Sequence, residues 1–229
     1  MPCSRRVWFN RAILNIGGTE MKFSGFSAQD FRVFDIPGFQ GRMVAIREEI
    51  RPKLGALGSM LLPEIERLTA GGVFAHVAKH ARRTVNPPDD TWVAFGPDKR
   101  GYKKHSHFKV AISRQCVRFL YEAGPEYQDK AKWLTSWKRK AGDLAPALKK
   151  AKGLAWFKNE HDEEPAALLA DLTPQEIKEL GDELTRARDG QFVLGRLVSE
   201  SEATKWGVNE HTAAALATFK ILAPLYRLR

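Results

Sequence analysis

Apolar residues change their spacing along the chain, and the change near residue 73 separates a helical part from a part rich in strands. In the helical part they recur three or four residues apart, at Met43, Ile46, Ile50, Leu54 and Leu57. This spacing predicts an amphipathic helix with a kink at Pro52. A second helix is predicted over 59–69, where two following glycines end the pattern. A short helix before both is predicted from the capping box of Ser27 and Asp30.

Strand signals follow between residues 73 and 121. Four short segments alternate in polarity or are rich in β-branched and aromatic residues: 73–78, 92–95, 108–112 and 117–121. The last two predict a hairpin that turns at 113–115. Hairpin-linked strands after a helical lead-in indicate an antiparallel sheet with helices packed mainly on one face.

The rest of the chain returns to helical spacing, with two further strands. A helix is predicted over 127–144, in which Trp133 and Trp137 lie one turn apart. Large aromatic residues at this spacing are expected in the core rather than as platforms for stacked bases. Strands are predicted over 154–157 and 192–198.

Two further helix starts are marked by capping residues. Thr173 and Glu176 form a capping box. Asn209 is expected to cap a last helix that ends at Pro224. With neither a repeat nor an obvious linker, the pattern predicts a single compact α+β domain over 21–229.

Residues 1–20 are expected to lie outside the native chain. Gly17 and Gly18 stand just before Met21, and two glycine codons can spell a ribosome-binding site ahead of a start codon. We therefore predict that translation starts at Met21 and that 1–20 is a non-native or disordered extension. Its removal would take away three arginines and one glutamate, so the net charge would fall from +10 to +8.

Lysine and arginine outnumber aspartate and glutamate by 37 to 27, which gives a net charge of +10. Because positive charge raises the local concentration of anions, the expected partner is nucleic acid or a phosphorylated small molecule. The two cysteines are too few for a disulfide framework, which indicates a reducing, cytoplasmic environment. No apolar run approaches the roughly 20 residues of a membrane span, so no membrane partner is expected.

The stretch from His76 to Phe108 concentrates the candidate chemistry. It holds four of the six histidines together with seven lysines and arginines. If 76–80 and 103–109 are extended neighbouring strands, their alternate side chains form a cationic, imidazole-bearing surface suited to phosphate. The candidate ligand-binding residues are His76, His80, Arg82, Arg83, Lys103, Lys104, His105 and His107.

Two other interpretations of this stretch stay open. It can be the active site of a phosphoester hydrolase, with His80 and His107 as general acid and base and Arg83 stabilising developing charge. It can instead be structural, with lysine and arginine stems covering the sheet in a protein that acts through a partner surface. His161 and His211, which lie apart from the cluster, are expected at the surface or at helix caps.

No metal site and no cofactor signature are predicted. His76 and His80 have the spacing of a zinc-protease pair, but Val77 stands where that motif needs glutamate. Asp89 and Asp90 are suited to Mg²⁺, yet beside two prolines they are more typical of a turn. The chain has no glycine-rich phosphate loop, serine elbow or dinucleotide fingerprint.

The segments HVAKHARRTVNPPDDTWVAF, at 76–95, and KRGYKKHSHFKV, at 99–110, resemble the YktB-like family of uncharacterised bacterial proteins. The resemblance extends less closely over about 23–226. It implies a compact cytoplasmic α+β domain of unknown function. It brings no established catalytic residues, so the candidate site depends on the residues themselves.

Overall fold

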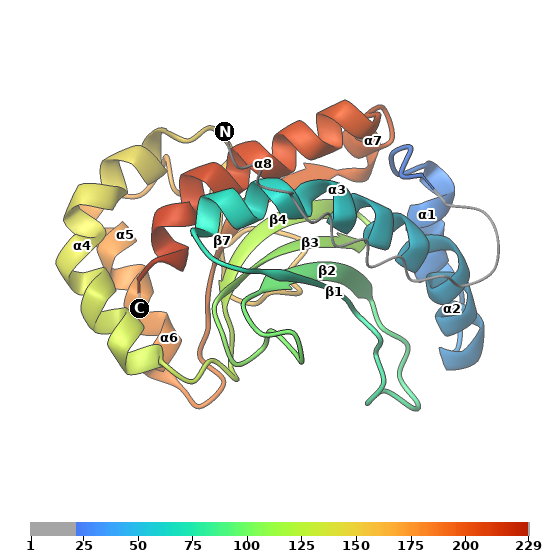
Figure 1. Cartoon of the computed structure of the whole chain (residues 1–229), viewed down its shortest axis with the longest axis horizontal. Helices are drawn as coiled ribbons and strands as arrows, with labels where there is room; N and C mark the ends of the chain where they lie inside the picture. The colour runs from blue at the N-terminus through green and yellow to red at the C-terminus, as the bar shows by residue number, and fades with distance from the viewer. Residues whose placement is uncertain (1–21, 229) are drawn as a thin grey trace, which may run out of the picture.

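The computed structural model describes residues 22–228, which form one antiparallel sheet of seven strands with helices packed against it (Figure 1). This confirms the predicted α+β class and the antiparallel sheet with helices mainly on one face. The predicted start at Met21 and the extension over 1–20 lie outside the described residues.

Six of the seven strands in the described residues fall where the sequence predicts them, and β6 was not predicted. The seven are β1 (Phe74–Val77), β2 (Asp90–Gly96), β3 (His107–Ser113), β4 (Cys116–Ala123), β5 (Leu154–Phe157), β6 (Ala167–Leu168) and β7 (Phe192–Ser199). Their order across the sheet is β1-β2-β3-β4-β7-β5-β6, and β3 and β4 form the predicted hairpin. The last strand, β7, therefore enters the sheet beside β4 and separates it from β5.

Helices occupy both ends of the described chain and the stretch between β4 and β7. They are α1 (Ala28–Arg32), α2 (Phe39–Ala45), α3 (Arg51–Thr69), α4 (Lys130–Lys150), α5 (Pro174–Glu179), α6 (Glu183–Arg186), α7 (Glu200–Ala203) and α8 (Val208–Tyr226). Three further turns link them: the 3₁₀ turns η1 (Val33–Asp35) and η3 (Leu180–Asp182), and the π turn η2 (Ile46–Ile50).

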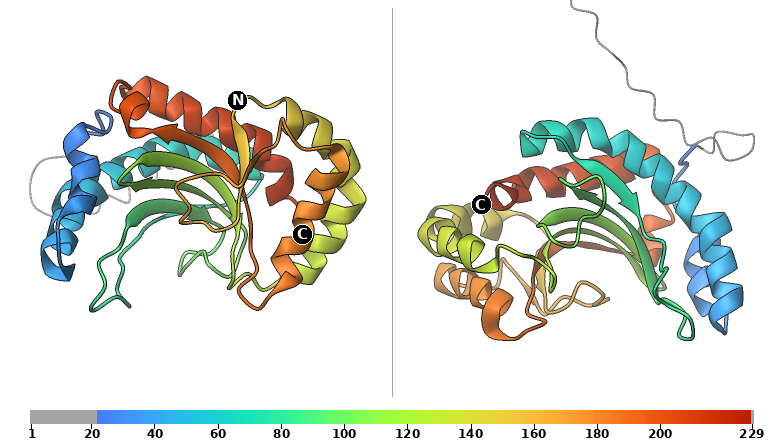
Figure 2. Two further views of the ribbon diagram at one scale, coloured as in Figure 1. Left: turned by 180° about the vertical axis from the view of Figure 1, so that it is seen from behind. Right: turned by 60° about the horizontal axis from the view of Figure 1, so that its bottom comes forward.

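One face of the sheet is apolar and is covered by α3 and α8 (Figures 1 and 2). Phe108 of β3 shows the packing, since its ring stacks on Phe219 and Tyr226 of α8 at centroid distances of 4.8 and 5.4 Å. Such close packing of aromatic rings adds to the free energy gained by burying their surface. This layer between sheet and helices is the main hydrophobic core.

Helix α3 runs without a break across Gly58, which lies between the end of the first predicted helix, at Leu57, and the start of the second, at Ser59. Gly58 faces the sheet, and a Cβ atom there would lie 3.0 Å from the side chain of Val93. The glycine therefore serves close packing instead of ending a helix. The kink predicted at Pro52 lies within a continuous helical run over 39–69, and the π turn η2 places a helical irregularity directly before this proline.

Helix α4 packs through its two tryptophans, as predicted. Trp133 and Trp137 are fully buried and stack on each other at 5.7 Å. Both also contact Phe192 of β7, and the Trp137 indole N–H donates to the carbonyl of Lys178 at 2.8 Å. The α4–α6 region is thus fixed to the sheet by buried aromatic rings.

The last helix differs from its prediction at both ends. Gly207, not Asn209, is the N-cap of α8, and Pro224 lies within the helix. His211 was expected at the surface or at a helix cap, but it is fully buried. Its ring packs edge-on against Phe26 and Trp206. This imidazole therefore belongs to the core.

The packing of Trp137 can be tested at Gly181. A Cβ atom at Gly181 would lie 2.1 Å from the Trp137 ring, whereas nothing lies within 4 Å of one at Gly142. Gly181→Ala should lower the free energy of unfolding by about 1–3 kcal/mol, because the indole must move. Gly142→Ala, in the exposed interior of α4, should raise it by about 0.5–1 kcal/mol. Urea unfolding measures both, and similar effects at the two sites would contradict this packing.

Candidate functional site

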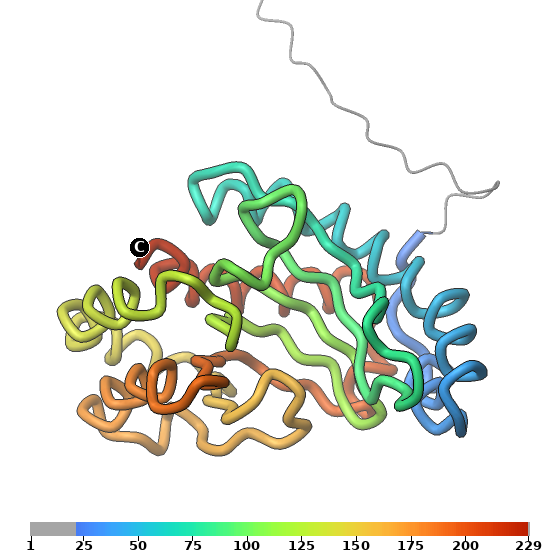
Figure 3. Tube along the Cα trace, turned by 90° about the horizontal axis from the view of Figure 1, so that it is seen from below, coloured from blue at the N-terminus to red at the C-terminus, as the bar shows by residue number. Residues whose placement is uncertain are grey.

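The face of the sheet opposite α3 and α8 carries a cluster of charged side chains. Because side chains alternate along strands, β2, β3 and β4 direct to this face Asp90, Trp92, His107, Lys109, Arg118 and Glu122. Among residues 22–228, loops rather than helices cross this side of the sheet (Figure 3). We call it the loop-covered face and define it by these six residues.

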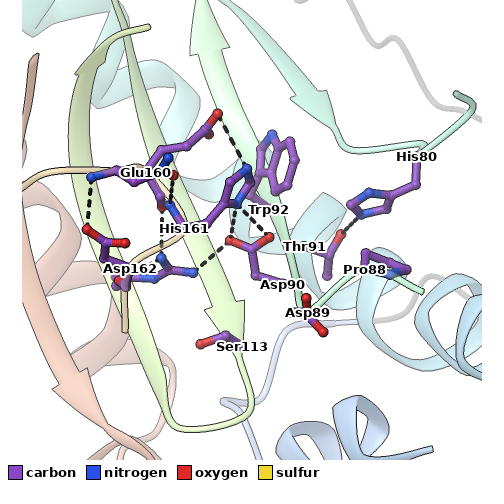
Figure 4. A network of polar contacts seen from close by, with 12 residues as sticks. His80, Pro88, Asp89, Asp90, Thr91, Trp92, Ser113, Glu160, His161 and Asp162 are labelled. Atoms are coloured by element: carbon purple, nitrogen blue, oxygen red, sulfur yellow. Dashed lines mark hydrogen bonds and ion pairs between the residues drawn. The ribbon is translucent and has the colours of Figure 1, made fainter. Parts of the chain in front are cut away.

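Arg118 and Asp90 form its first buried ion pair. Arg118 Nη2 donates to Asp90 Oδ2 at 2.7 Å, and both side chains are almost without solvent contact. The other end of the guanidinium, Nη1, donates to the carbonyl oxygens of Glu160 and Asp162 at 2.8 and 2.9 Å. His161 Nδ1 lies 3.0 Å from both Asp90 oxygens (Figure 4). The 158–163 loop is thereby bound to the sheet.

Lys109 lies at the centre of the second buried group of charges. Its ammonium contacts the carboxylates of Glu122, at 3.5 Å, and Glu160. It also lies 4.2 Å from the centre of the Trp92 ring, a cation–π distance. The ammonium is completely buried, so its charge must be compensated by these neighbours.

Both sheet carboxylates stay ionised despite their burial. Burial raises the pKa of Asp90, but the bond from His161 and the charges of Arg118 and Lys109 outweigh it and lower this pKa to about 2. Burial likewise raises the pKa of Glu122, but the charges of Lys109 and His107 lower it to about 2. At neutral pH the loop-covered face therefore holds fixed, paired charges.

A small pocket of about 70 Å³ opens beside this network. Its lining residues are Tyr102, Lys103, Glu122, Gly124, Pro125, Glu126 and Glu160. Glu122 and Glu160 connect the pocket to Lys109, and Lys103 brings a solvent-exposed cation to its edge. The pocket therefore lies where the buried charges of the sheet meet an exposed cation of the loops.

Two of the candidate histidines lie around Tyr102. His107 is fully buried, with its ring 4.7 Å from that of Tyr102 and its Nε2 3.2 Å from Glu122 Oε2. The His76 ring lies 5.5 Å from the same tyrosine, and its Nε2 bonds to the carbonyl of Asp98 at 3.0 Å. His76 and His107 do not come from neighbouring strands, because β2 lies between β1 and β3. That part of the prediction was wrong, although both rings do contact Tyr102.

His80 belongs to a different group of contacts. The residue is not extended as predicted, because its φ of 50° lies in the left-handed region. Its ring packs edge-on against Trp92 at 5.2 Å, and its Nε2 bonds to the Thr91 hydroxyl at 3.1 Å (Figure 4). Trp92 Nε1 in turn donates to the Tyr102 hydroxyl at 2.6 Å. The Trp92–Tyr102 pair thus lies between His80 and His107, the two candidate catalytic histidines.

The cationic candidates lie on loops at the edge of the loop-covered face. The segment 103–105, predicted as strand, forms a turn, and β3 begins only at His107. Lys103 and Arg82, from different loops, approach the same oxygen of Glu126 at 3.6 and 4.0 Å. The Arg82 side chain is 91% exposed.

The other two cations and the remaining histidine of the candidate set have fewer contacts. Arg83 makes one long hydrogen bond of 3.4 Å, to the carbonyl of Pro87. Lys104 is exposed, and His105 is half-buried. Asp89, in the same loop as these arginines, pairs with Arg42 of α2 and with neither of them.

Sequence reasoning missed most of the buried network. It gave no role to Arg118 or Glu122, it placed Lys109 only within the cationic segment 103–109, and it expected His161 at the surface or at a helix cap. The expected surface position of His161 is partly confirmed, because its side chain is 42% exposed although it is bonded to Asp90. The signal that was missed is the apolar sequence around these charges. In FKVAI and VRFLYEA the charged residues are flanked by apolar and aromatic residues, as in a buried central strand.

Two kinds of feature are absent from the described residues. Nowhere in 22–228 do three or more His, Cys, Asp or Glu side chains come together in a way that could hold a metal ion. Within the same residues, none of the helices has the length and hydrophobicity to cross a membrane.

The cost of unpairing the network can be measured at Arg118. Arg118→Met should lower the free energy of unfolding by about 3–5 kcal/mol, because Asp90 stays buried without its cation. Arg114→Met is the matched control, since Arg114 pairs with Asp35 and Glu200 at the exposed end of the hairpin. It should cost about 1 kcal/mol or less. Equal losses in urea unfolding would show that the buried pair has no special role.

His80 predicts a specific acid sensitivity. Burial lowers its pKa from 6.5 to about 4, outweighing the charge of Asp90, so between these values the unfolded chain binds a proton that the folded chain does not. Stability should therefore fall as the pH is lowered from about 6.5 to about 4. His80→Asn, which suits the left-handed backbone, should lose less stability over this window. His105→Asn should follow the unchanged protein in thermal melts, and identical slopes for all three proteins would contradict the prediction.

Comparison with known proteins gives the family of this fold. The model described as "Domain of unknown function (DUF1054)" matches residues 26–226. The chain is 32% identical over 203 residues to a UPF0637 protein of Bacillus licheniformis, a match covering 89% of this chain and 95% of the relative.

Other bacterial relatives show the same extent of similarity. A UPF0637 protein of Shouchella clausii is 34% identical over 215 residues, covering 91% of this chain and 96% of the relative. One from Staphylococcus carnosus is 34% identical over 174 residues, covering 76% and 84%. The resemblance to an uncharacterised bacterial family is thereby confirmed. The chain belongs to the DUF1054 family, a family of bacterial proteins whose function is unknown.

Proposed function

We propose that this protein binds a phosphate-bearing anion, a nucleotide or nucleic acid, at the cationic edge of the loop-covered face. One observation carries the proposal. The carboxylates of this face are buried and paired, whereas the cations on the loops around it are exposed. The positive charge of the loops is therefore left available to a ligand.

The balance of charge within 76–108 supports this reading. Seven lysines and arginines stand against three aspartates in this stretch. Each aspartate already has a partner: Asp89 accepts from Arg42, Asp90 from Arg118, and Asp98 from the backbone N–H of Arg100. Two of the three aspartates, Asp89 and Asp90, are thus paired with arginines from outside this stretch, which leaves seven cations against Asp98.

Glu126 is the acid that two of these cations do approach. Arg82 and Lys103 share one of its oxygens at 4.0 and 3.6 Å, distances that give weak contacts in water. An anion carrying two or three charges can compete for this pair, because phosphate oxygens accept several charge-assisted hydrogen bonds at once. Two loops that are far apart in the chain would then bind one group.

The buried network gives this site a fixed base. Lys109 and Arg118 connect three strands to the 158–163 loop, and the Trp92–Tyr102 bond joins β2 to the 97–106 loop. A rigid base reduces the entropy lost when a ligand binds, since only the long loop side chains have to become ordered. The structural interpretation therefore applies to His107, and the ligand-binding interpretation to Arg82, Arg83, Lys103 and Lys104.

The hydrolase interpretation has less support. General acid–base catalysis by two histidines requires both rings to reach one substrate. His80 and His107 are separated by the Trp92–Tyr102 pair, and His107 is fully buried against Glu122. We therefore propose binding without assigning catalysis.

Removing two edge cations tests the proposal. The double variant Arg82→Ala, Lys103→Ala should bind a fluorescent single-stranded oligonucleotide or ATP about 10-fold or more weakly, because charge-assisted contacts to phosphate are lost. For the oligonucleotide, the slope of log affinity against log salt should also become shallower, by roughly 1–2. Fluorescence anisotropy at several salt concentrations measures both quantities.

A charge-matched control separates a site from overall charge. Arg67→Ala, Lys220→Ala removes two exposed cations from α3 and α8, on the other side of the sheet. This control should bind like the unchanged protein. Equal losses in the two double variants, or no binding by the unchanged protein, would overturn the proposal.

A further inference from the structure

Helix α4 carries a stripe of positive charge on its solvent side. Eight lysines and arginines lie within 130–152, against a single acid, Asp143. Lys132, Arg139 and Lys150 are exposed. Residues that are 7 or 18 positions apart point in nearly the same direction on an α-helix, because a turn takes about 3.6 residues. These three side chains therefore form one line along α4, with about 10 Å and then about 16 Å of helix between them.

The opposite side of α4 packs against the rest of the protein. Its buried residues are Trp133, Ser136, Trp137, Ala141, Ala145 and Leu148. Since each residue turns the helix by roughly 100°, the line of cations lies opposite this buried side. The helix lies at one end of the molecule, far from α1 and α2 (Figure 1). Its line of cations therefore faces outward.

The chain itself does not neutralise this line. In the described part of the chain, the one ion pair of an α4 side chain joins Lys138 to Asp182 at 2.7 Å. The acidic residues that follow α4 in the sequence have other contacts: Glu160 pairs with Lys109, and Glu163 accepts from the turn between β3 and β4. The cations of the line are thus free to bind an anion.

The line begins beside the cationic edge of the loop-covered face. The carbonyl of Lys104 accepts from the backbone N–H of Gln128 at 3.2 Å, and Lys103 approaches Glu126 at 3.6 Å. The turn that carries the two lysines therefore contacts the segment leading into α4. Lys132 lies four residues beyond Gln128. The exposed cations of the edge are thus continued by those of α4.

The length of this surface determines the kind of ligand that can use all of it. From Lys132 to Lys150 the line alone extends over about 27 Å. The phosphates of a single nucleotide are adjacent to one another, so they cannot reach both ends. A nucleic acid can, because each strand of a duplex offers one phosphate per roughly 3.4 Å of its axis.

Two other partners for a cationic helix fit poorly. In the described residues no exposed large apolar side chain lies on α4, so the helix has nothing to insert into a membrane surface. Phe74 is the one exposed aromatic ring among the same residues, whereas proteins that bind single strands stack successive bases on several rings. The backbone of a duplex is bound through its charge and needs neither group.

We propose that α4 binds the phosphate backbone of a double-stranded nucleic acid that runs from the cationic edge along Lys132, Arg139 and Lys150. This inference rests on the proposed function and deepens it, because it selects nucleic acid over a single nucleotide. Arg82 and Lys103 contact phosphates at one end of the surface, and α4 contacts those further along. Since phosphate contacts carry no sequence information, binding does not depend on the base sequence.

The test is the triple variant Lys132→Gln, Arg139→Gln, Lys150→Gln, in which glutamine keeps a high helix propensity. It should bind a fluorescent DNA duplex of about 20 base pairs about 10-fold or more weakly than the unchanged protein. The slope of log affinity against log salt should become shallower by about 2–3. Its affinity for ATP should stay unchanged, because ATP reaches the edge alone. Fluorescence anisotropy measures the duplex, and isothermal titration calorimetry measures ATP.

A charge-matched control and a gain of binding make the test specific. Arg32→Gln, Arg47→Gln, Lys205→Gln removes three exposed cations from α1, η2 and the turn after α7, at the other end of the molecule (Figure 1). This control should bind the duplex like the unchanged protein. Asp143→Asn removes the acid beside the line and should strengthen duplex binding by about 2-fold or more, a result that a damaged fold cannot produce.

The outcomes separate this proposal from the proposed function. Full duplex binding by the α4 triple variant, with weaker binding by Arg82→Ala, Lys103→Ala, would overturn the role of α4 and leave the proposed function standing. Full binding of duplex and ATP by Arg82→Ala, Lys103→Ala would overturn the proposed function itself. Equal losses in the two triple variants would show an effect of overall charge and overturn the α4 surface. Tighter binding of the single strand than of the duplex would overturn the choice of duplex.

Discussion

The buried guanidinium of Arg118 lies in the middle of the sheet, so its charge and its hydrogen-bond donors need partners from several parts of the chain at once. Asp90 of β2 supplies the opposite charge, and two carbonyls of the 158–163 loop accept the remaining donors that the structure satisfies. Lys109 imposes a similar requirement on Glu122 and Glu160. Since removing one buried partner is far more costly than removing the pair, strand order, register and loop position are mutually dependent.

This dependence explains the division of the histidine-rich segment. Side chains that point from the strands, such as His107, are enclosed by the network, whereas those on the flanking turns, such as Arg82 and Lys103, stay in solvent. The same segment therefore contains a structural half and a half that is free to bind. The net charge of +10 does not by itself select a site. The pairing of the local acids favours the loop-covered face, because Asp89 and Asp90 are paired with other arginines and the loop cations Arg82 and Lys103 have only long contacts to Glu126.

The alternating and helical spacings predicted most helices and strands. They failed where contacts between residues far apart in the chain determine the structure. The β3–β4 hairpin was predictable because its partners are adjacent in the chain. Nothing local indicates that β7 enters beside β4, or that His161 reaches Asp90 across 71 residues. Gly58 resembles a helix end until the close approach of Val93 is known. The left-handed backbone of His80 also depends on neighbours that only the fold supplies.

The buried and the exposed charges of the loop-covered face differ in how they relate to stability. The buried charges pair with one another across the strands, so removing one partner leaves the other buried without its counter-charge. The exposed cations Arg82 and Lys103 make only long contacts to Glu126, which contribute little to stability in water. A ligand that binds these exposed cations therefore adds contacts without rebuilding the buried network.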